Sequence, residues 1–316
     1  MKGEFDFIHR LKSRFNLGRI GDDCAVLPKD NDTDQVITAD MLIEDIDFRL
    51  EWTTPEFLGH KALAVSLSDI AAMGAAPKWA MLSIGIPERL WKTDFLDLFY
   101  DGLHSLADQH SVELIGGDIS RIEDKLVIDS IVLGEVATGR AVLRSGAKAG
   151  DLIFVTGYVG GAAAGLKLLE NGERIAEPMP VPLRHLLFRQ LQPLPQVRTA
   201  KLLQEYHLPT AMIDISDGLS SDLGHLCEAS GVGAVIESDL IPVDPAISAV
   251  MTSSLDLALH GGEDFELLFT TDQKNISVAQ DLGFHMIGEI TANAGIIELN
   301  ASGKHSILEP KGYRHF

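Results

Sequence analysis

Carboxylates recur along this chain where apolar segments give way to glycine, serine or another acid. Each alone is most often a turn former or a helix cap, but together they favour a shared site. They are Asp22 and Asp23 after Gly21, Asp40 after residues 36–39, Asp69 in Ser-Leu-Ser-Asp, Asp118 after two glycines, Asp214 and Asp217 in Asp-Ile-Ser-Asp-Gly, and Glu263 and Asp264 after two glycines.

Such a set supports the binding of hard cations. Carboxylates crowded at one place repel one another unless cations lie between them. Oxygen ligands without clustered Cys or His indicate Mg²⁺ and not zinc or copper. Because Mg²⁺ usually joins protein carboxylates to substrate phosphates, the set predicts a nucleotide-dependent enzyme.

The standard motifs for phosphate binding and nucleophilic catalysis are absent. The chain contains no G-x-x-x-x-G-K-[ST], no H-R-D with D-F-G, and no G-x-S-x-G. The glycines of residues 157–165 lack the G-x-G-x-x-G spacing, so we interpret that segment as close helix–strand packing. Arg144 is either a solvated linker residue or a phosphate clamp that reaches across a domain boundary.

The elements that must position these residues alternate between strand and helix patterns. Strands are expected at residues 36–43, 78–86, 112–115 and 126–136, with helices over residues 55–73 and after an N-cap at Thr93. This order predicts a mixed sheet with helices on one face.

The second half repeats the alternation. Strands are expected at residues 152–156, 211–215, 234–237, 265–271, 285–290 and 295–299, with helices at 161–170, between proline-rich connectors at 177–182 and 193–195, and at 217–230. Asp217 is a candidate N-cap of the last helix. The polar, glycine-rich segment 140–151 predicts a boundary between an N-terminal domain (1–148) and a C-terminal domain (149–316), both of the α/β class.

The charge composition limits the classes of partner that this chain is expected to bind. The 316 residues include 46 Asp and Glu against 26 Lys and Arg, a net charge of −20. This balance argues against nucleic acid and anionic membranes, whereas divalent cations still allow a polyanionic small molecule to bind. Residues 152–169, the longest weakly charged run, contain four glycines and Lys167, so no membrane span is expected.

The spacing of the cysteines and the composition of the N-terminus indicate the cellular compartment. Cys24 and Cys227 form no CxxC pair, which indicates neither a zinc site nor a disulfide framework. Cys24 is interpreted as a small packed residue. Residues 1–13 lack the apolar core of a secretory signal, so we expect a cytoplasmic protein.

Several motifs in this order resemble those of the thiamine-monophosphate kinase family, whose superfamily includes aminoimidazole ribonucleotide synthetase, selenophosphate synthetase and the hydrogenase maturation factor HypE. The resemblance covers essentially the whole chain. Its marks are Ile-Gly-Asp-Asp-Cys-Ala-Val-Leu at 20–27, Thr-Ala-Asp at 38–40, the run from Lys61 to Gly74, Ile-Gly-Gly-Asp at 115–118, Leu-Arg-Ser-Gly-Ala-Lys at 143–148, Ile-Asp-Ile-Ser-Asp-Gly at 213–218, Gly-Gly-Glu-Asp at 261–264 and Lys-Gly-Tyr-Arg-His-Phe at 311–316.

The resemblance implies an activity and a set of site residues. It implies transfer of the γ-phosphoryl group of ATP to thiamine monophosphate, with several Mg²⁺ ions, in a homodimer that pairs N-terminal sheets. The implied metal ligands are Asp23, Ala39 through its carbonyl, Asp40, Asp69, Asp118, Asp214 and Asp217. The implied ATP contacts are Gly117, Asp118, Arg144 and Ser216, and the implied substrate contacts are Asp47 (where the family often has a histidine), Glu263, Tyr313 and Phe316.

Phosphoryl transfer needs mainly positioning and neutralisation of charge. Asp118, Arg144 and Asp214 are therefore expected to support it. No general base is assigned, because the acceptor phosphate is already an anion near neutral pH. The alternatives are another ATP-dependent synthetase of the superfamily, of the selenophosphate or purine-pathway type, or a non-enzymatic nucleotide sensor.

Overall fold

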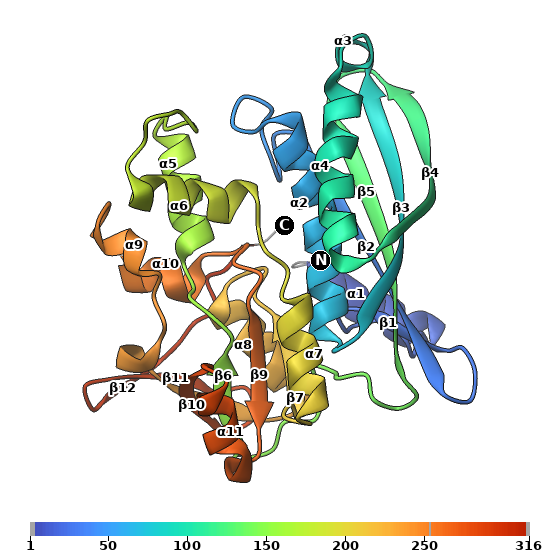
Figure 1. The fold of residues 1–316 in the computed structure, drawn as a ribbon. Helices are drawn as coiled ribbons and strands as arrows, with labels where there is room; N and C mark the ends of the chain where they lie inside the picture. The colour runs from blue at the N-terminus through green and yellow to red at the C-terminus, as the bar shows by residue number, and fades with distance from the viewer. Residues whose placement is uncertain (1–3, 253, 314–316) are drawn as a thin grey trace.

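The computed structural model describes residues 4–252 and 254–313. Its N-terminal sheet has five strands in the order β1-β2-β5-β3-β4, in which only β3 and β4 pair in parallel. The strands are β1 (Ala25–Pro28), β2 (Thr33–Ile43), β3 (Ala76–Pro87), β4 (Glu113–Ile122) and β5 (Val127–Ala137). Helices α2 (Pro55–Ala72) and α4 (Phe95–His110) pack together beside this sheet (Figure 1), which confirms the predicted mixed α/β sheet.

Helix α2 connects the two halves of the molecule. The Thr54 side chain caps its start by accepting a hydrogen bond from Phe57 N, and Pro55 occupies the first turn. Nearly every residue of α2 is buried, because it contacts β2 and β5 on one side and strand β7 and helix α7 of the second half on the other. A helix whose apolar residues are spread around its whole circumference is expected in such a position.

The C-terminal sheet has seven strands in the order β12-β11-β8-β10-β6-β9-β7, in which only β11 and β8 are parallel. The strands are β6 (Leu152–Val155), β7 (Ala211–Asp214), β8 (Gly233–Glu237), β9 (Leu267–Thr271), β10 (His285–Thr291), β11 (Ile297–Ala301) and β12 (Lys304–Ile307). Helices α5 (Gly161–Glu170), α6 (Val181–Leu191), α7 (Val197–Glu205), α8 (Leu219–Ser230), α9 (Pro245–Ser248), α10 (Ser254–His260) and α11 (Ile276–Asp281) surround it.

Side chains from the two faces of this sheet pack into two separate hydrophobic cores. Ile153 and Val155 pack with the buried face of α8, whereas Phe154 between them packs with α7 and α11. Successive strand residues point to opposite faces, so the sheet is covered on both sides. No helix among the described residues is long and apolar enough to cross a membrane.

Strand β4 is longer than the sequence indicated. The prediction ended a strand at Ile115 and treated Gly116 and Gly117 as a turn, but β4 continues to Ile122 alongside β3. A Cβ on Gly117 would lie 1.8 Å from the carbonyl oxygen of Leu82. Glycine is thus required there by the close approach of β3 and not by a turn.

Other departures are small. Helix α8 begins at Leu219 with Gly218 as its N-cap, so the expectation that Asp217 caps it is wrong. Helix α4 begins at Phe95 with Asp94 as its N-cap, so the expectation that Thr93 is the N-cap is wrong, although Thr93 Oγ1 accepts a hydrogen bond from Phe95 N. The α-helices and strands absent from the prediction are α1 (Glu4–Phe15), α3 (Glu88–Trp91), α7, α9, α10, α11, β1 and β12.

The glycines of residues 157–165 do allow close packing, but between helices and not between a helix and a strand as predicted. Helix α5 lies against α6, and a Cβ on Gly165 would lie 2.1 Å from the carbonyl oxygen of Leu186. Cys24, interpreted as a packed residue, is 3% exposed.

Candidate active site

Three of the predicted metal ligands meet between the two halves of the chain. Asp23, Asp69 and Asp214 each offer a carboxylate oxygen that lies within 4.8 Å of the other two. Asp23 precedes β1, Asp69 lies in the last turn of α2, and Asp214 is the last residue of β7. Both sheets and the helix between them therefore build this acid cluster.

Two serine hydroxyl groups of α2 donate hydrogen bonds to carboxylates of this region. Ser68 Oγ donates a 2.5 Å hydrogen bond to Asp214 Oδ2, and Ser66 Oγ donates a 2.7 Å hydrogen bond to Asp40 Oδ2. Both serines are completely buried. The Ser-Leu-Ser-Asp run thus orients carboxylates of two different strands and also supplies Asp69.

Strand β2 contributes one face to the cluster. Thr38 Oγ1 donates a 2.5 Å hydrogen bond to Asp69 Oδ2, and Asp40 lies two residues further on the same face. Ala39 lies between them and its side chain is exposed. Because successive side chains of a strand point to opposite faces, the Ala39 methyl group points away from the cluster. Only the backbone carbonyl of Ala39 could therefore bind a metal ion.

Burial and mutual repulsion hold protons on these carboxyl groups. Burial, reinforced by the charge of Asp23, raises the pKa of Asp214 to about 7, against the hydrogen bond from Ser68. Burial also raises the pKa of Asp40 to about 6. The pKa of Asp69 lies well above its ordinary range, because burial is joined by the charges of Asp40 and Asp214. Such a cluster attracts cations strongly.

The donor set fits a hard divalent cation. Asp23 Oδ2 is buried and has no hydrogen-bond partner among the described residues. A buried carboxylate oxygen without a partner is costly unless a cation satisfies it. All the convergent ligand atoms are oxygens, which suits Mg²⁺.

Arg144 reaches this cluster from the segment between the two sheets. Its Nε lies 3.0 Å from Asp23 Oδ1, its backbone N lies 3.2 Å from Asp22 Oδ2, and its side chain is 18% exposed. The alternative of a solvated linker residue is wrong, because the guanidinium is held against the acids. The charge of Arg144 opposes the effect of burial, which raises the pKa of Asp22 to about 6.

Asp217 belongs to a second group of ligands. Its carboxylate, that of Asp222 and a ring nitrogen of His225 lie within 4.8 Å of one another. Asp222 Oδ2 also accepts a 2.9 Å hydrogen bond from Gly218 N. Sequence reasoning missed Asp222 and His225, although residues three apart on a predicted helix lie on one face.

Glu263, an expected substrate contact, is held by both halves of the chain. Lys61 Nζ of α2 lies 2.7 Å from Glu263 Oε1, and Gln190 Nε2 of α6 donates to Glu263 Oε2. Lys61 is almost fully buried, whereas the Glu263 side chain is 29% exposed. The backbone of Glu263 has φ of 65°, a left-handed conformation that the surrounding contacts must maintain.

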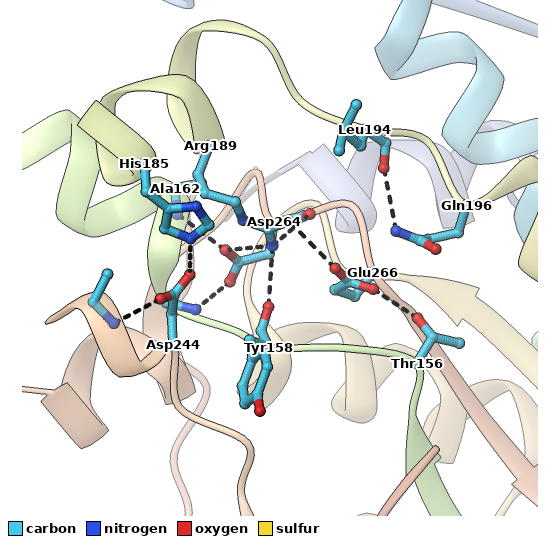
Figure 2. A network of polar contacts seen from close by, with 12 residues as sticks. Thr156, Tyr158, Ala162, His185, Arg189, Leu194, Gln196, Asp244, Asp264 and Glu266 are labelled. Carbon is cyan, nitrogen blue, oxygen red and sulfur yellow. Dashed lines mark hydrogen bonds and ion pairs between the residues drawn. The ribbon is translucent and has the colours of Figure 1, made fainter. Parts of the chain in front are cut away.

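A buried polar network anchors the loop that carries Glu263 (Figure 2). Asp264 accepts hydrogen bonds from Gly160 N at 2.5 Å and Ala162 N at 3.0 Å, at the start of α5. Arg189 Nη1 lies 3.3 Å from Glu266 Oε1, and Arg189 also pairs with Asp264. A carboxylate at a helix N-terminus is stabilising, so Asp264 of the Gly-Gly-Glu-Asp motif has a structural role.

The remaining predicted residues lie apart from the acid cluster. Gly117 and Asp118 are exposed on β4, where Ser120 Oγ lies 3.2 Å from Asp118 Oδ2. Asp118 is in neither group of convergent ligands. Asp47 Oδ2 accepts a 2.8 Å hydrogen bond from Ile43 N, which closes a turn after β2.

The predicted contacts near Asp217 are partly backbone groups. The Ser216 carbonyl accepts a 2.8 Å hydrogen bond from Glu263 N. Tyr313 N lies 3.1 Å from the carbonyl oxygen of Asp217, and the Tyr313 residue is 47% exposed. Phe316 lies outside the described residues.

Comparison with protein families gives two matches that divide the chain. The profile for AIR synthase related protein, N-terminal domain, matches residues 21–136, and the profile for the C-terminal domain matches residues 148–298. The two-sheet fold and the acid cluster between the sheets thus define an AIR synthase-related protein.

Similarity to individual proteins identifies a family within this class. Thiamine-monophosphate kinase of Bacillus subtilis is 36% identical over 326 residues, covering 99% of both chains. Thiamine-monophosphate kinase of Escherichia coli K12 is 39% identical over 336 residues, covering 99% of this chain and 98% of the relative. The solved structure of AaThiL complexed with AMPPCP and TMP has a TM-score of 0.88 at 34% identity, covering 99% of this chain and 97% of that one. The chain belongs to the thiamine-monophosphate kinase family.

Proposed function

We propose that this protein transfers the γ-phosphoryl group of ATP to thiamine monophosphate, forming thiamine diphosphate and ADP. The observation that carries the proposal is the convergence of Asp23, Asp69 and Asp214, from both halves of the chain, at one site. Its full-length relatives include thiamine-monophosphate kinases and a structure complexed with AMPPCP and TMP.

The acids are proposed to hold several Mg²⁺ ions. Asp23, Asp40, Asp69 and Asp214 would form one set with the carbonyl of Ala39, while Asp217 and Asp118 would contribute from either side. Bound Mg²⁺ supplies neutralisation of the phosphate charges that must approach one another. The orphaned Asp23 Oδ2 supports this arrangement.

The residues of the chain contribute positioning and not proton transfer. Arg144 binds Asp23 through Nε and Nη2, which leaves Nη1 to donate to a phosphate oxygen of ATP. Gly117, Asp118 and Ser216 are proposed to contact ATP as well. No general base is assigned, because a phosphate acceptor is an anion at neutral pH.

Glu263 is proposed to contact the thiamine moiety from a fixed position. The ion pair with Lys61 and the hydrogen bond from Gln190 hold its carboxylate in place before substrate binds. Tyr313, Phe316 and Asp47 are the other proposed substrate contacts. Tyr313 is 47% exposed, and an aromatic side chain suits contact with a planar ligand.

The active form is proposed to be a homodimer that pairs N-terminal sheets. Strand β4 is an edge strand, and its residues are exposed along nearly its whole length. It exposes the apolar side chains Leu114, Ile115 and Ile119, at 37%, 49% and 46%. An exposed apolar edge strand needs cover, which a second copy would supply. Light scattering that reports ~34 kDa at micromolar concentrations would contradict the dimer.

Two further assignments are proposals. The two sheets, which are joined by residues 138–151, support a division into domains at residues 1–148 and 149–316. A cytoplasmic location is supported by the two buried cysteines, Cys24 and Cys227, which are both free.

The activity is tested directly by ³¹P NMR after incubation with MgATP and thiamine monophosphate. We expect the two phosphorus signals of thiamine diphosphate, and no phosphorylation of free thiamine, because the site is built for an anionic acceptor. Asp214→Asn should lose most of the activity, whereas Asp281→Asn, which removes an exposed acid of α11, should retain it. Turnover of thiamine at the same rate as its monophosphate, or ATP binding without turnover, would refute the proposal.

A further inference from the structure

A pocket separate from the acid cluster lies where the end of α2 meets α7. Its volume is about 500 Å³, and its walls come from residues 74–76, 109–111 and 135–140 of the first half and from residues 197–207 of the second. Figure 1 shows α7 beside the N-terminal half, and α7 contacts both α2 and β3. None of the lining residues is a predicted contact of metal, ATP or thiamine.

The pocket gathers positive charge in a strongly acidic chain. Its ionisable lining residues are Arg140, Arg198, Lys201, His110, His207, Glu135 and Glu205. Both carboxylates already have a cationic partner: Glu135 Oε1 lies 2.5 Å from Lys29 Nζ, and Glu205 Oε1 lies 3.8 Å from Lys201 Nζ. The two arginines therefore decide the electrostatic potential of the pocket.

Neither arginine is neutralised by a carboxylate. The guanidinium of Arg140 contacts His207 Nδ1, which is a ring nitrogen and not a carboxylate oxygen. Arg198 forms no ion pair with the described residues, 4–252 and 254–313. The pKa of His110 is lowered by burial and then by the charge of Arg198, as expected near an unneutralised cation.

The rest of the lining is largely apolar. Ala75, Ala76, Val136 and Val197 form part of the wall, so the pocket combines an apolar surface with uncompensated guanidinium groups. Its volume is within the range of about 300–1,000 Å³ that is typical of small-molecule sites. An inorganic ion would leave most of that apolar surface unfilled.

We propose that this pocket binds a small organic phosphate. Arg140 and Arg198 would hold the phosphate group, while Ala75, Ala76 and Val136 would contact its apolar body. A phosphate monoester carries a charge of about −1.5 to −2 at pH 7. That charge matches the two guanidinium charges of the pocket better than the single negative charge of a carboxylate ligand would. The ligand would bridge the two halves at the end of the helix that carries Asp69.

The test is isothermal titration calorimetry of the full chain with phenyl phosphate in EDTA. Without divalent cations the acid cluster repels phosphates, so a binding heat reports on the pocket. We expect phenyl phosphate to bind at least about tenfold more tightly than inorganic phosphate, phenol or benzoate. Absence of binding at millimolar phenyl phosphate, or equal binding of phenol or benzoate, would overturn the proposal.

Charge-reversal variants locate the binding. Arg198→Glu should weaken phenyl phosphate binding by about tenfold or more. A Glu in the first turn of α7 suits that helix, so folding should be unaffected. Arg184→Glu on α6 is the matched control and should bind as the natural chain does. Lys201→Glu, a change at an exposed position, should also weaken binding. Equal affinity in Arg198→Glu and Arg184→Glu would place the phosphate elsewhere and refute the inference.

Discussion

Ser68 Oγ donates a 2.5 Å hydrogen bond to Asp214 Oδ2, which joins helix α2 to the end of strand β7. The contact links residues that are 146 positions apart, and both are buried. It sets the position of a carboxylate of the second half relative to Asp69, which lies one residue after Ser68. The acid cluster therefore exists only when the two halves of the chain are docked together.

The first prediction concerns the stability of the metal-free protein. Asp214 has a pKa of about 7 in the fold, against an ordinary value of 3.8, so the folded state binds the proton more tightly. Its contribution to the unfolding free energy then falls as the pH rises from about 4 to 7. Asp214→Asn removes this loss, so the variant should be more stable than the natural chain by on the order of 2 kcal/mol at pH 8.

Thermal unfolding in EDTA at several pH values checks this sign. The advantage of Asp214→Asn should shrink toward pH 5, where the carboxyl of Asp214 is protonated in the folded state and so no longer charged among its neighbours. Comparison of the two chains also cancels the opposite contribution of His60 and His110, whose pKa values are lowered. Excess Mg²⁺ should abolish the advantage. A variant that is less stable at pH 8 in EDTA would show that Asp214 does not repel its neighbours.

The second prediction concerns the ion pair of Lys61 and Glu263. Lys61→Met leaves the carboxylate without its cation and should cost on the order of 3 kcal/mol in unfolding free energy. Glu263→Gln in the same chain should restore much of that loss, because the pair is then replaced by uncharged groups. A double-mutant cycle by urea unfolding measures the coupling, and strictly additive losses would contradict it.

The same variants separate positioning from binding. Lys61→Met should raise KM for thiamine monophosphate more than it lowers kcat, because Lys61 acts on Glu263 and not on the reacting phosphates. A matched control is Lys167→Met, which changes an exposed lysine of α5. A loss confined to kcat would assign Lys61 to the phosphoryl transfer itself.

The third prediction concerns Asp47, a proposed substrate contact at a position where the resemblance implies a histidine in many members of the family. Its Oδ2 accepts a hydrogen bond from Ile43 N, so the side chain closes a turn. Asp47→His should lower kcat by less than about tenfold, or 1.4 kcal/mol in the barrier. The loss of the turn should cost about 1 kcal/mol of stability. Steady-state kinetics with thermal unfolding tests both, and a loss of several orders of magnitude in kcat would give Asp47 a primary role.

The acids that meet in the structure could be predicted because local signals mark them. Asp23 follows a glycine and another acid, Asp69 follows a serine, and Asp214 ends an apolar segment. The alternation of strands and helices predicts that such positions gather. Their burial behind hydroxyl donors could not be predicted. That property depends on which buried side chains of α2 reach β2 and β7. Because α2 is buried on nearly all sides and has no distinct apolar face, its periodicity gives no orientation.

Other features of the fold and the site could not be predicted from the sequence, for physical reasons that the structure identifies. The position of Asp118 within β4 depends on the pairing of Gly117 with β3, which resembles a turn in sequence. The partnership of Lys61 with Glu263 joins residues that are far apart in the chain, and no local pattern reports it. Helix α7 is short and follows the proline-rich connector at 193–195, and no element is predicted from the sequence over its residues.

The last prediction is the metal requirement on which the proposed mechanism depends. Octahedral Mg²⁺ keeps several waters and usually takes one or two carboxylates, so Asp23, Asp40, Asp69 and Asp214 exceed the needs of the one ion that arrives with ATP. The velocity should therefore keep rising as Mg²⁺ is added beyond the ATP concentration. Ser68→Ala should raise the Mg²⁺ concentration needed for half-maximal velocity, because the lost hydrogen bond raises the pKa of Asp214 further and protons then compete better with the metal. This effect should be larger at pH 6.5 than at pH 8.5.

Asp214→Asn tests the same requirement through charge. It preserves the shape of the side chain and should lower kcat by on the order of 10²-fold, about 2.7 kcal/mol of transition-state stabilisation. Asp281→Asn should leave kcat and the Mg²⁺ response unchanged, because that acid is exposed on α11. Mg²⁺ titrations at fixed MgATP make the measurement. A velocity that is flat above equivalence, together with a fully active Asp214→Asn protein, would refute the multi-metal site, because four crowded carboxylates would then have no function in catalysis.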